Sequence, residues 1–373
     1  MPFFAWPGRS TVTVLVLGFV MIGRAGAAPD DVFLQAEPTT GEFTRFRTEA
    51  SYDMVNRAVD VFNAQGSHGA APENAGNYRG GKLLIGYKFS PQWSAAATYW
   101  RRGIDYGPDN NQINSWLLAA HYDPLAEPGA RDRVIFRLAL WGDYSPSLQR
   151  TTSFQVRDTV LNGVTVRNAN DVQAQADMVV SGELDMRNQL TGFFGLGVSR
   201  VSIGGINTQV RQGNCRFNVG IGTDNVATGM LAAPCRSGDV TVNSASFTGN
   251  ASQFGLDVDK DFNYTAGFLN LGAAWRWKYE RFAARLGYQF QYLIRSNVDD
   301  RAANYGYGPI KSNHTLGLEL SYTMGKGVEA FLRGQASRYN FVGTVPFLYN
   351  AAMAGRLDRY YGYTSIGIRY SGF

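Results

Sequence analysis

Two residues near the start of a predicted strand, Ser312 and His314, have the types that nucleophilic catalysis needs. A serine hydroxyl becomes a nucleophile when an adjacent histidine accepts its proton. Residues two apart on a strand lie on the same face, so these two side chains would be neighbours. No residue that would orient His314 can be placed from the sequence. We therefore favour two polar residues at a strand end, and we expect no catalytic residues and no enzyme.

Three alternating carboxylates in the segment DVDKDFN, Asp257, Asp259 and Asp261, resemble the start of a calcium-binding loop. The glycine after the third acid and the final glutamate of such a loop are missing. On an extended strand the three carboxylates would share a face and could bind calcium or bridge lipopolysaccharide. A solvated strand extension is the simpler interpretation, and we predict no metal site and no cofactor.

The first 28 residues have the order of a secretory signal peptide. Arg9 precedes a short apolar run over 11–23, and Ala25 and Ala27 form a cleavage pattern. We expect residues 29–42 to follow as an N-terminal lead in the periplasm. Cleavage removes Arg9 and Arg24, which lowers the net charge from +5 to +3. So small an excess, without a basic stripe, predicts no nucleic-acid partner.

The two cysteines, Cys215 and Cys235, lie in a segment rich in Gly, Asn and Thr. In an exported protein a single pair most simply forms a disulfide. A metal site would need further ligands, and the nearby sequence has no histidine. We predict the disulfide, and hence a defined shape for the long segment 204–263 that contains it.

Alternation of apolar and polar residues dominates the chain from Phe43 onward. In 282–294 the apolar residues occupy the even positions, while Arg285 and Gln289 lie on the other face. No later stretch approaches 18 consecutive apolar residues, which excludes transmembrane helices. Similar segments begin near these twelve residues: Phe43, Lys82, Trp93, Asn114, Val134, Val172, Leu190, Gly267, Phe282, His314, Val328 and Tyr360.

The connections between these segments differ in length at the two ends. Short turns are predicted near 90–93, 185–189, 278–281 and 324–327, and long polar loops at 55–80, 145–170, 204–263, 296–311 and 340–356. Aromatic residues cluster beside the short turns, as in the interfacial girdles of membrane barrels. These patterns predict an all-β fold, a transmembrane antiparallel up-and-down β-barrel of about 12 strands over 43–373. A secreted sandwich or propeller would have shorter strands and no such loop polarity.

The chain resembles the Gram-negative outer-membrane β-barrels, of the porin-like type, which typically end in an aromatic residue such as Phe373. The resemblance implies the cell outer membrane as location, with short turns in the periplasm and long loops outside. It also implies outer-membrane lipid and lipopolysaccharide as surroundings, and assembly machinery that reads Phe373. The Ser312 and His314 pair is similar to that of the outer-membrane phospholipases, although the order of the two residues is reversed.

The polar phase of the strands faces the lumen of such a barrel. We therefore predict these pore-lining residues: Arg45, Arg47, Lys82, Lys88, Arg137, Asp177, Glu183, Arg276, Arg285, Glu319, Glu329, Arg333 and Arg369. The bases concentrate on the first and last strands and the acids on the middle ones, which predicts a positive wall facing a negative wall. Such a field selects hydrated solutes. The same charges could instead pair across a narrow barrel and rigidify it.

We favour a passive channel for small polar or anionic solutes. A non-conducting barrel with a role in adhesion, envelope assembly or surface structure is the first alternative, and an outer-membrane lipid hydrolase is the second. The loop 204–263 is far longer than usual connections. We expect it to cap the barrel or to constrict the lumen in part.

Overall fold

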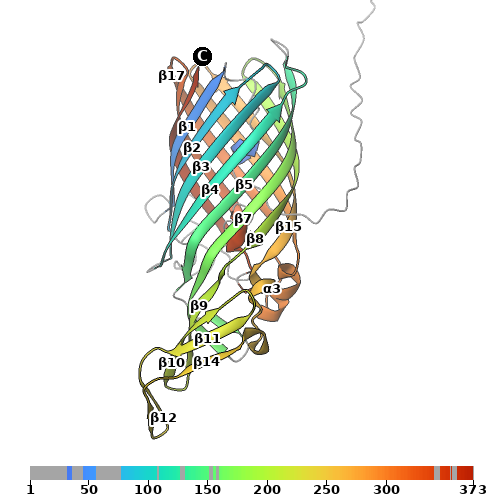
Figure 1. Ribbon diagram of the computed structural model, residues 1–373. Helices are drawn as coiled ribbons and strands as arrows, with labels where there is room; N and C mark the ends of the chain where they lie inside the picture. Colours follow the sequence, from blue (N-terminus) through green and yellow to red (C-terminus); the bar gives the residue numbers. More distant parts are fainter. Residues whose placement is uncertain are drawn as a thin grey trace, which may run out of the picture.

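The chain forms a closed antiparallel β-barrel with a sheet extension at one end (Figure 1). The computed structural model describes residues 32–35, 45–55, 77–106, 109–126, 131–150, 154–156, 159–339, 345–352, 354 and 359–372. Twelve strands within these ranges make the barrel. They are β1 (Phe46–Val55), β2 (Asn77–Lys88), β3 (Trp93–Tyr106), β4 (Asp109–Tyr122), β5 (Asp132–Arg150), β7 (Thr159–Glu183), β8 (Asn188–Ser202), β15 (Tyr264–Tyr279), β16 (Phe282–Arg295), β17 (Ser312–Gly325), β18 (Val328–Tyr339) and β19 (Arg359–Gly372).

Each barrel strand pairs with its two neighbours, and β1 pairs with β19 from Phe46↔Gly372 to Met54↔Thr364, which closes the ring. A closed barrel leaves no strand edge unpaired, as strands in lipid require. The predicted antiparallel up-and-down β-barrel of about 12 strands is therefore confirmed, although β7 begins at Thr159, well before the predicted Val172.

Outward and inward faces alternate along every barrel strand, as predicted. Leu138 on β5 and Ile366 on β19 point outward and remain 66% and 60% exposed. Asn270 on β15 and Arg333 on β18 point inward and are buried. The protein thus has an apolar outer belt around a polar interior, the inverse of a water-soluble barrel.

The short connections gather at the end of the barrel that holds the C-terminal strand end (Figure 1). The turn between β15 and β16 places Glu280 at φ 50°, a left-handed conformation that a tight hairpin requires. Aromatic pairs lie beside these turns: the Trp93 and Tyr122 rings are 4.7 Å apart, and those of Phe282 and Tyr322 are 4.9 Å apart. The predicted aromatic clusters at this end are confirmed.

The sheet continues beyond the barrel at the opposite end. β5 and β7 extend into the predicted loop 145–170, and β6 (Phe154–Val156) pairs with β7. Four further strands, β9 to β11 and β14, prolong the sheet, and β12 and β13 form a separate hairpin at its tip (Figure 1). Their bounds are β9 (Gly205–Gln212), β10 (Cys215–Ile221), β11 (Val226–Leu231), β12 (Cys235–Ser237), β13 (Val240–Val242) and β14 (Ser246–Asn250). We call β9 to β14 the strand extension.

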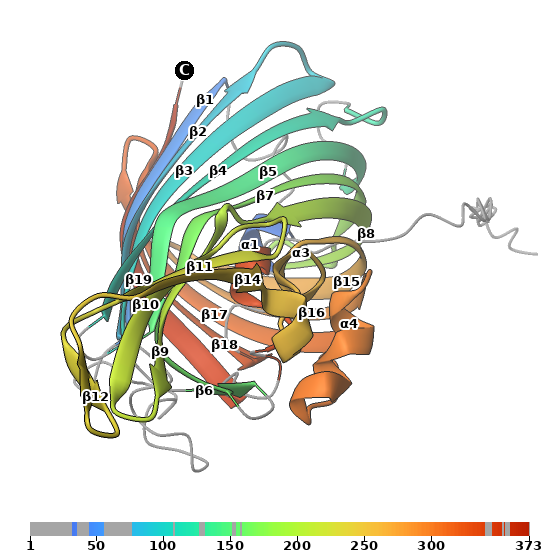
Figure 2. The same ribbon diagram turned by 60° about the horizontal axis from the view of Figure 1, so that its bottom comes forward.

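The disulfide between Cys215 and Cys235 ties β10 to β12 near the tip of the strand extension. Its formation confirms the predicted pairing. The predicted position of this loop is wrong in part, because the strands project away from the barrel mouth and do not enter the lumen (Figures 1 and 2). Hydrogen bonding along β7, β9, β10 and β11 explains the difference, since each strand completes the edge of the previous one.

Short helices occupy the connections at the long-loop end and one site inside the barrel. They are α1 (Val32–Gln35), η1 (Ala251–Phe254), α3 (Val258–Phe262), α4 (Val298–Arg301), η2 (Ala302–Tyr305) and η3 (Pro346–Leu348). Among the described residues, no helix has the length and apolar character to cross a membrane.

A second apolar core closes the long-loop end. Its members come from the ends of barrel strands, from β9, β10 and β11 of the strand extension, from η1, α3, α4 and η2, and from the segment 345–354. The side chains of Ile104, Ile206, Val258, Leu293 and Val298 in it are fully buried. We call this cluster the cap. It resembles the interior of a soluble domain placed on the mouth of the barrel.

The predicted signal peptide (1–28) and assembly residue Phe373 lie outside the described residues. Most of the predicted periplasmic lead, 29–42, also does. Its described part, α1, differs from that prediction because it lies inside the barrel (Figure 2).

Candidate functional site: the occupied lumen

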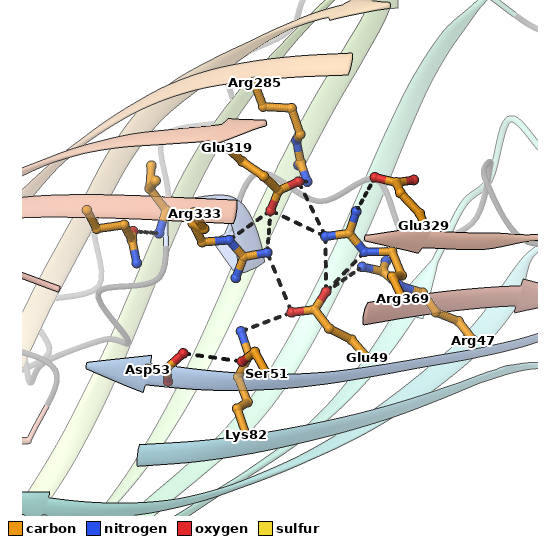
Figure 3. Close-up of polar contacts among 12 residues, drawn as sticks. Arg47, Glu49, Ser51, Asp53, Lys82, Arg285, Glu319, Glu329, Arg333 and Arg369 are labelled. Atoms are coloured by element: carbon orange, nitrogen blue, oxygen red, sulfur yellow. Dashed lines mark hydrogen bonds and ion pairs between the residues drawn. The ribbon is translucent and has the colours of Figure 1, made fainter. Parts of the chain in front are cut away.

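The lumen is crossed by a network of buried ion pairs centred on Glu49 of β1 (Figure 3). A Glu49 carboxylate oxygen lies 3.1 Å from Lys82 Nζ, and the other lies 3.0 Å from the Arg369 guanidinium. Arg47 and Arg333 approach the same carboxylate at 3.4 and 3.5 Å. One carboxylate thus links β1, β2, β18 and β19.

Glu319 of β17 is the second centre of this network. It accepts hydrogen bonds from Arg333 at 2.5 and 2.8 Å and lies 3.4 Å from Arg369. Arg285 on β16 approaches it at 3.5 Å, and Arg369 also reaches Glu329 at 3.1 Å. We call these eight side chains, Arg47, Glu49, Lys82, Arg285, Glu319, Glu329, Arg333 and Arg369, the ionic network. Its five cations exceed its three carboxylates by two charges.

Two further pairs lie on the strands of the opposite wall. Arg137 donates to Asp177 at 2.7 Å across β5 and β7, and Arg102 donates to Asp143 at 2.7 Å. Ser115 donates to Asp143 as well. All these side chains are buried. The basic residues of this wall are therefore neutralised by its own acids.

The helix α1 sits against the inner wall in a recess made by two glycines. Gly287 and Gly317 face each other across β16 and β17. A Cβ atom on Gly317 would lie 2.6 Å from Val32 and 2.8 Å from Phe33, so a larger residue there would exclude the helix. The Val32 N–H donates to the Gln335 side-chain oxygen at 3.0 Å.

Phe33 joins α1 to the ionic network. The guanidinium groups of Arg285 and Arg333 lie 5.0 and 5.4 Å from the centre of its ring. Val32 and Phe33 are fully buried. Burial of each side chain contributes about 2 kcal/mol, and each cation and ring contact in a desolvated site adds about 1 kcal/mol. These contacts hold the helix in the lumen.

The segment 345–354 closes the barrel at the long-loop end. It connects β18 to β19, yet η3 contacts β7 and β8. Tyr264 of β15 donates to the Pro346 carbonyl at 2.5 Å, and the Arg295 guanidinium lies 3.7 Å from the centre of the Tyr349 ring. Val345 and Ala351 within it are fully buried in the cap. The mouth is thus covered by this segment together with the rest of the cap, to which Ile206, Val219 and Ala227 of the strand extension also belong.

The predicted lining residues fall into three groups. Buried in the lumen are Arg47, Lys82, Arg137, Asp177, Glu319, Arg333 and Arg369. Half-buried on the same face are Lys88, Arg276, Arg285 and Glu329. Arg45 and Glu183 are exposed at the short-turn end.

The predicted arrangement of a positive wall facing a negative wall is wrong. The acids that neutralise the basic strands come from those strands, because Glu49 and Glu319 project among the arginines of the ionic network. Glu49 was not among the predicted lining residues, although it lies two positions after Arg47 and therefore on the same face of β1. Arg102 was not among them either, although it points inward while its neighbour Arg101 is exposed.

His314 lies on the outer face of the barrel and contacts aromatic side chains. Its Nδ1 lies 2.8 Å from the Tyr288 hydroxyl on the outer face, and its ring packs 5.2 Å from Phe290. Both contacts place His314 in an aromatic patch of the outward surface. Ser312 lies at the start of β17, paired with Tyr292.

The alternating aspartates belong to the cap and not to a cation site. Buried Asp261 accepts hydrogen bonds from Arg301 and, at 2.7 Å, from the Tyr305 hydroxyl. The hydrogen bond from Arg301 to Asp261 raises the pKa of Arg301. Burial and the Asp261 charge raise the pKa of Tyr305. Asp257 caps α3 by accepting the Lys260 N–H at 3.1 Å. No cluster that could hold a metal occurs among the described residues.

Comparisons with known proteins identify no family, since no family model and no curated protein matches the chain. Solved structures are similar to it over most of its length. One is the translocator domain of the autotransporter NalP from Neisseria meningitidis, with 13% identity, a TM-score of 0.43, and coverage of 87% of this chain and 88% of that chain.

Two solved transport proteins are also similar. The KdgM porin has 7% identity and a TM-score of 0.35, with 87% of this chain and 98% of that chain covered. The toluene transporter TodX of P. putida has 11% identity and a TM-score of 0.36, with 92% of each chain covered. We draw no function from likenesses this distant.

Proposed function

We propose that this protein is an outer-membrane channel for small anionic or polar solutes that rests in a closed state. On this proposal the short turns face the periplasm, the cap faces the cell exterior, and outer-membrane lipid and lipopolysaccharide surround the apolar belt. The assembly machinery would act on the C-terminal strand. We assign no catalytic role to Ser312 and His314.

The proposal rests on which parts of the chain fill the lumen. Eight-stranded barrels are filled by the side chains of their own wall, and wider barrels have room for more. In this barrel α1 and the segment 345–354 occupy that room, and neither belongs to the wall. Both can leave without unpairing a barrel strand, so closure is compatible with opening.

The excess of positive charge supports a preference for anions. If α1 left the lumen, the guanidinium groups of Arg285 and Arg333 would lose the Phe33 ring and would face water and passing solutes. A lumen with a surplus of fixed cations concentrates anions. Solute size would then be limited where the side chains of the ionic network project into the lumen.

Single-channel recording in planar bilayers under a KCl gradient tests the proposal. The full chain should be nearly silent. A variant that lacks residues 31–36 and has a Gly/Ser linker in place of 345–354 should give ohmic steps and an anion-selective reversal potential. Arg285→Glu in that variant should shift the reversal potential toward cations. Silence of a double variant that still migrates as a folded barrel on unheated gels would reject the channel.

A non-conducting surface barrel is the second candidate, and the strand extension favours it. This region is ordered, cross-linked, and presents apolar side chains to solvent: Met230 and Val240 are 69% and 65% exposed. Exposed apolar groups of this kind mark interaction surfaces. Silence of the double variant, together with binding of cells to a surface through the extension, would favour this candidate.

A further inference from the structure

A basic cavity opens at the short-turn end of the barrel, below the ionic network. Its volume is about 460 Å³, within the range of small-molecule sites. Among the described residues, seven cationic side chains and three carboxylates line it. Arg47, Glu329 and Arg369, at its inner end, also belong to the ionic network (Figure 3).

Two of the three carboxylates are already engaged. Glu329 pairs with Arg369 at 3.1 Å. Asp185 accepts the N–H groups of Arg187 and Asn188 at 2.7 and 2.9 Å within its own turn. The Arg187 N–H and the Asn188 side chain hold the pKa of Asp185 below its ordinary value. The three carboxylates remain charged, but they are outnumbered by the seven cations, so the described lining keeps a positive surplus.

Three cations of the cavity make no ion pair within the part of the chain that the structure describes: Arg131, Arg187 and Lys278. They come from three successive hairpins, β4 to β5, β7 to β8, and β15 to β16. Arg187 is oriented by Tyr279, whose ring centre lies 4.9 Å from its guanidinium.

Backbone hydrogen bonds hold these hairpins together. The Glu183 N–H donates to the Arg131 carbonyl at 3.1 Å, and the Lys278 N–H donates to the Arg187 carbonyl at 2.8 Å. The hairpins that carry these cations are therefore held in place around the cavity before any ligand arrives. Preorganised guanidinium and ammonium groups suit carboxylates and phosphates, which accept several hydrogen bonds at once.

We propose that this cavity is a binding site for a small polyvalent anion, a carboxylate or a phosphate, that enters from the periplasmic side. Binding does not require the lumen to open, because the cavity lies at the short-turn end and exists while α1 and the segment 345–354 are in place. A neutral solute would gain nothing from the surplus of positive charge. A monovalent anion would satisfy only one of the three cations.

Isothermal titration calorimetry on the full chain in neutral detergent tests the proposal with citrate, pyrophosphate, acetate and glucose as probes. We expect saturable binding of citrate, pyrophosphate or both, and none of glucose. The probe that binds more tightly identifies the carboxylate or the phosphate as the ligand class. Binding should weaken as salt rises, because ions screen exposed charges.

The variant Arg131→Gln/Lys278→Gln removes two exposed cations of the cavity and should weaken binding about tenfold. The matched control Arg216→Gln/Arg236→Gln removes two exposed cations of the strand extension and should leave binding unchanged. Absence of binding for both polyvalent anions, or equal weakening in both variants, would overturn the proposal. Because the assay measures no current, its outcome does not depend on the channel.

Discussion

The lumen and the cap are built on opposite principles within one chain. The lumen buries charged side chains against one another, with Glu49 and Glu319 each surrounded by cations. The cap buries mainly aliphatic and aromatic side chains, with few ion pairs such as that of Asp261 with Arg301, and Asp257 caps the N-terminus of α3. The outer belt of the barrel exposes the same kinds of apolar side chain that the cap buries.

The difference follows from the solvent that each region meets. The apolar face of a membrane barrel lies in lipid, so its interior can be largely polar, and ion pairs and hydrogen bonds supply much of the cohesion across the lumen. Small apolar clusters, such as that of Val32 and Phe33 with Phe193, add to it. The cap meets water and is held together by the hydrophobic effect. The same kind of substitution should therefore have different consequences in the two regions.

The largest effect is expected from Glu49→Ala. Loss of this carboxylate leaves four buried cations without their shared partner. Removing one partner of a buried ion pair costs about 3 to 5 kcal/mol. The midpoint of urea unfolding, followed in lipid vesicles, should fall accordingly. Glu183→Ala, at the exposed rim, is the control and should leave it unchanged; equal shifts in both variants would mean that the ionic network does not stabilise the barrel.

The cap should respond most to Phe262→Ala. Phe262 on α3 is buried in the cap, and such a truncation costs about 3 kcal/mol. Limited proteolysis should cut the long-loop end faster while the barrel keeps its folded mobility on gels. Leu138→Ala on the outward belt, where the side chain is 66% exposed, is the comparison and should change neither. Unfolding of the barrel together with the cap would show that the two regions are not independent.

Loss of the disulfide should affect the strand extension alone. The bond joins positions 20 residues apart, and its removal in Cys215→Ser/Cys235→Ser is expected to cost about 3 kcal/mol at most. Hydrogen exchange should accelerate in β10 to β13 and stay unchanged in the barrel strands. Deletion of the tip hairpin, residues 235–242, in that variant should also leave conductance unchanged, because none of these residues belongs to the cap. A change in conductance would place the extension in the permeation path.

The smallest effect concerns the pH dependence of the cap. Burial opposes ionisation of Asp257, yet hydrogen bonds from Asn225 and the Lys260 N–H lower its pKa on balance. Because the pKa of Asp257 is lower in the folded state, the carboxylate stabilises the fold at pH values above its unfolded pKa of about 3.9. This stabilisation is lost as the pH falls through the folded pKa. Hydrogen-exchange protection of α3 should therefore persist from pH 7 to about pH 4 and decline below it.

Asp257→Ala tests the same carboxylate at neutral pH. Loss of the helix cap costs about 1 kcal/mol, and the decline below about pH 4 should become shallower. An unchanged acid profile in this variant would assign the pH dependence to other groups.

The barrel was predictable because lipid imposes a strict pattern on sequence. Alternation over 282–294 located β16, and the short turn before it located the end of β15. The predicted loop 145–170 was largely strand, because β7 there pairs with β5, β6 and β9 outside the membrane, where alternation is not enforced.

The contents of the lumen could not be predicted in the same way. Parity along a strand assigns a side chain to a face but does not say which strand it will meet across the barrel. The contact of Arg369 on the last strand with Glu49 on the first is of this kind. The helix α1 has no periodic signature at all, since only the absence of side chains at Gly287 and Gly317 makes room for it.

The position of α1 is the central claim, and thiol labelling tests it most directly. Phe33→Cys in the full chain, reconstituted in vesicles, should react slowly with a membrane-impermeant maleimide, because the residue is buried in the lumen. Adding Gly317→Leu, which fills the recess, should expel the helix and raise the rate at least about tenfold. Gly308→Leu, where an added Cβ meets nothing, is the matched control and should leave labelling slow. Fast labelling of Phe33→Cys with Gly317 intact would contradict a helix seated in the lumen.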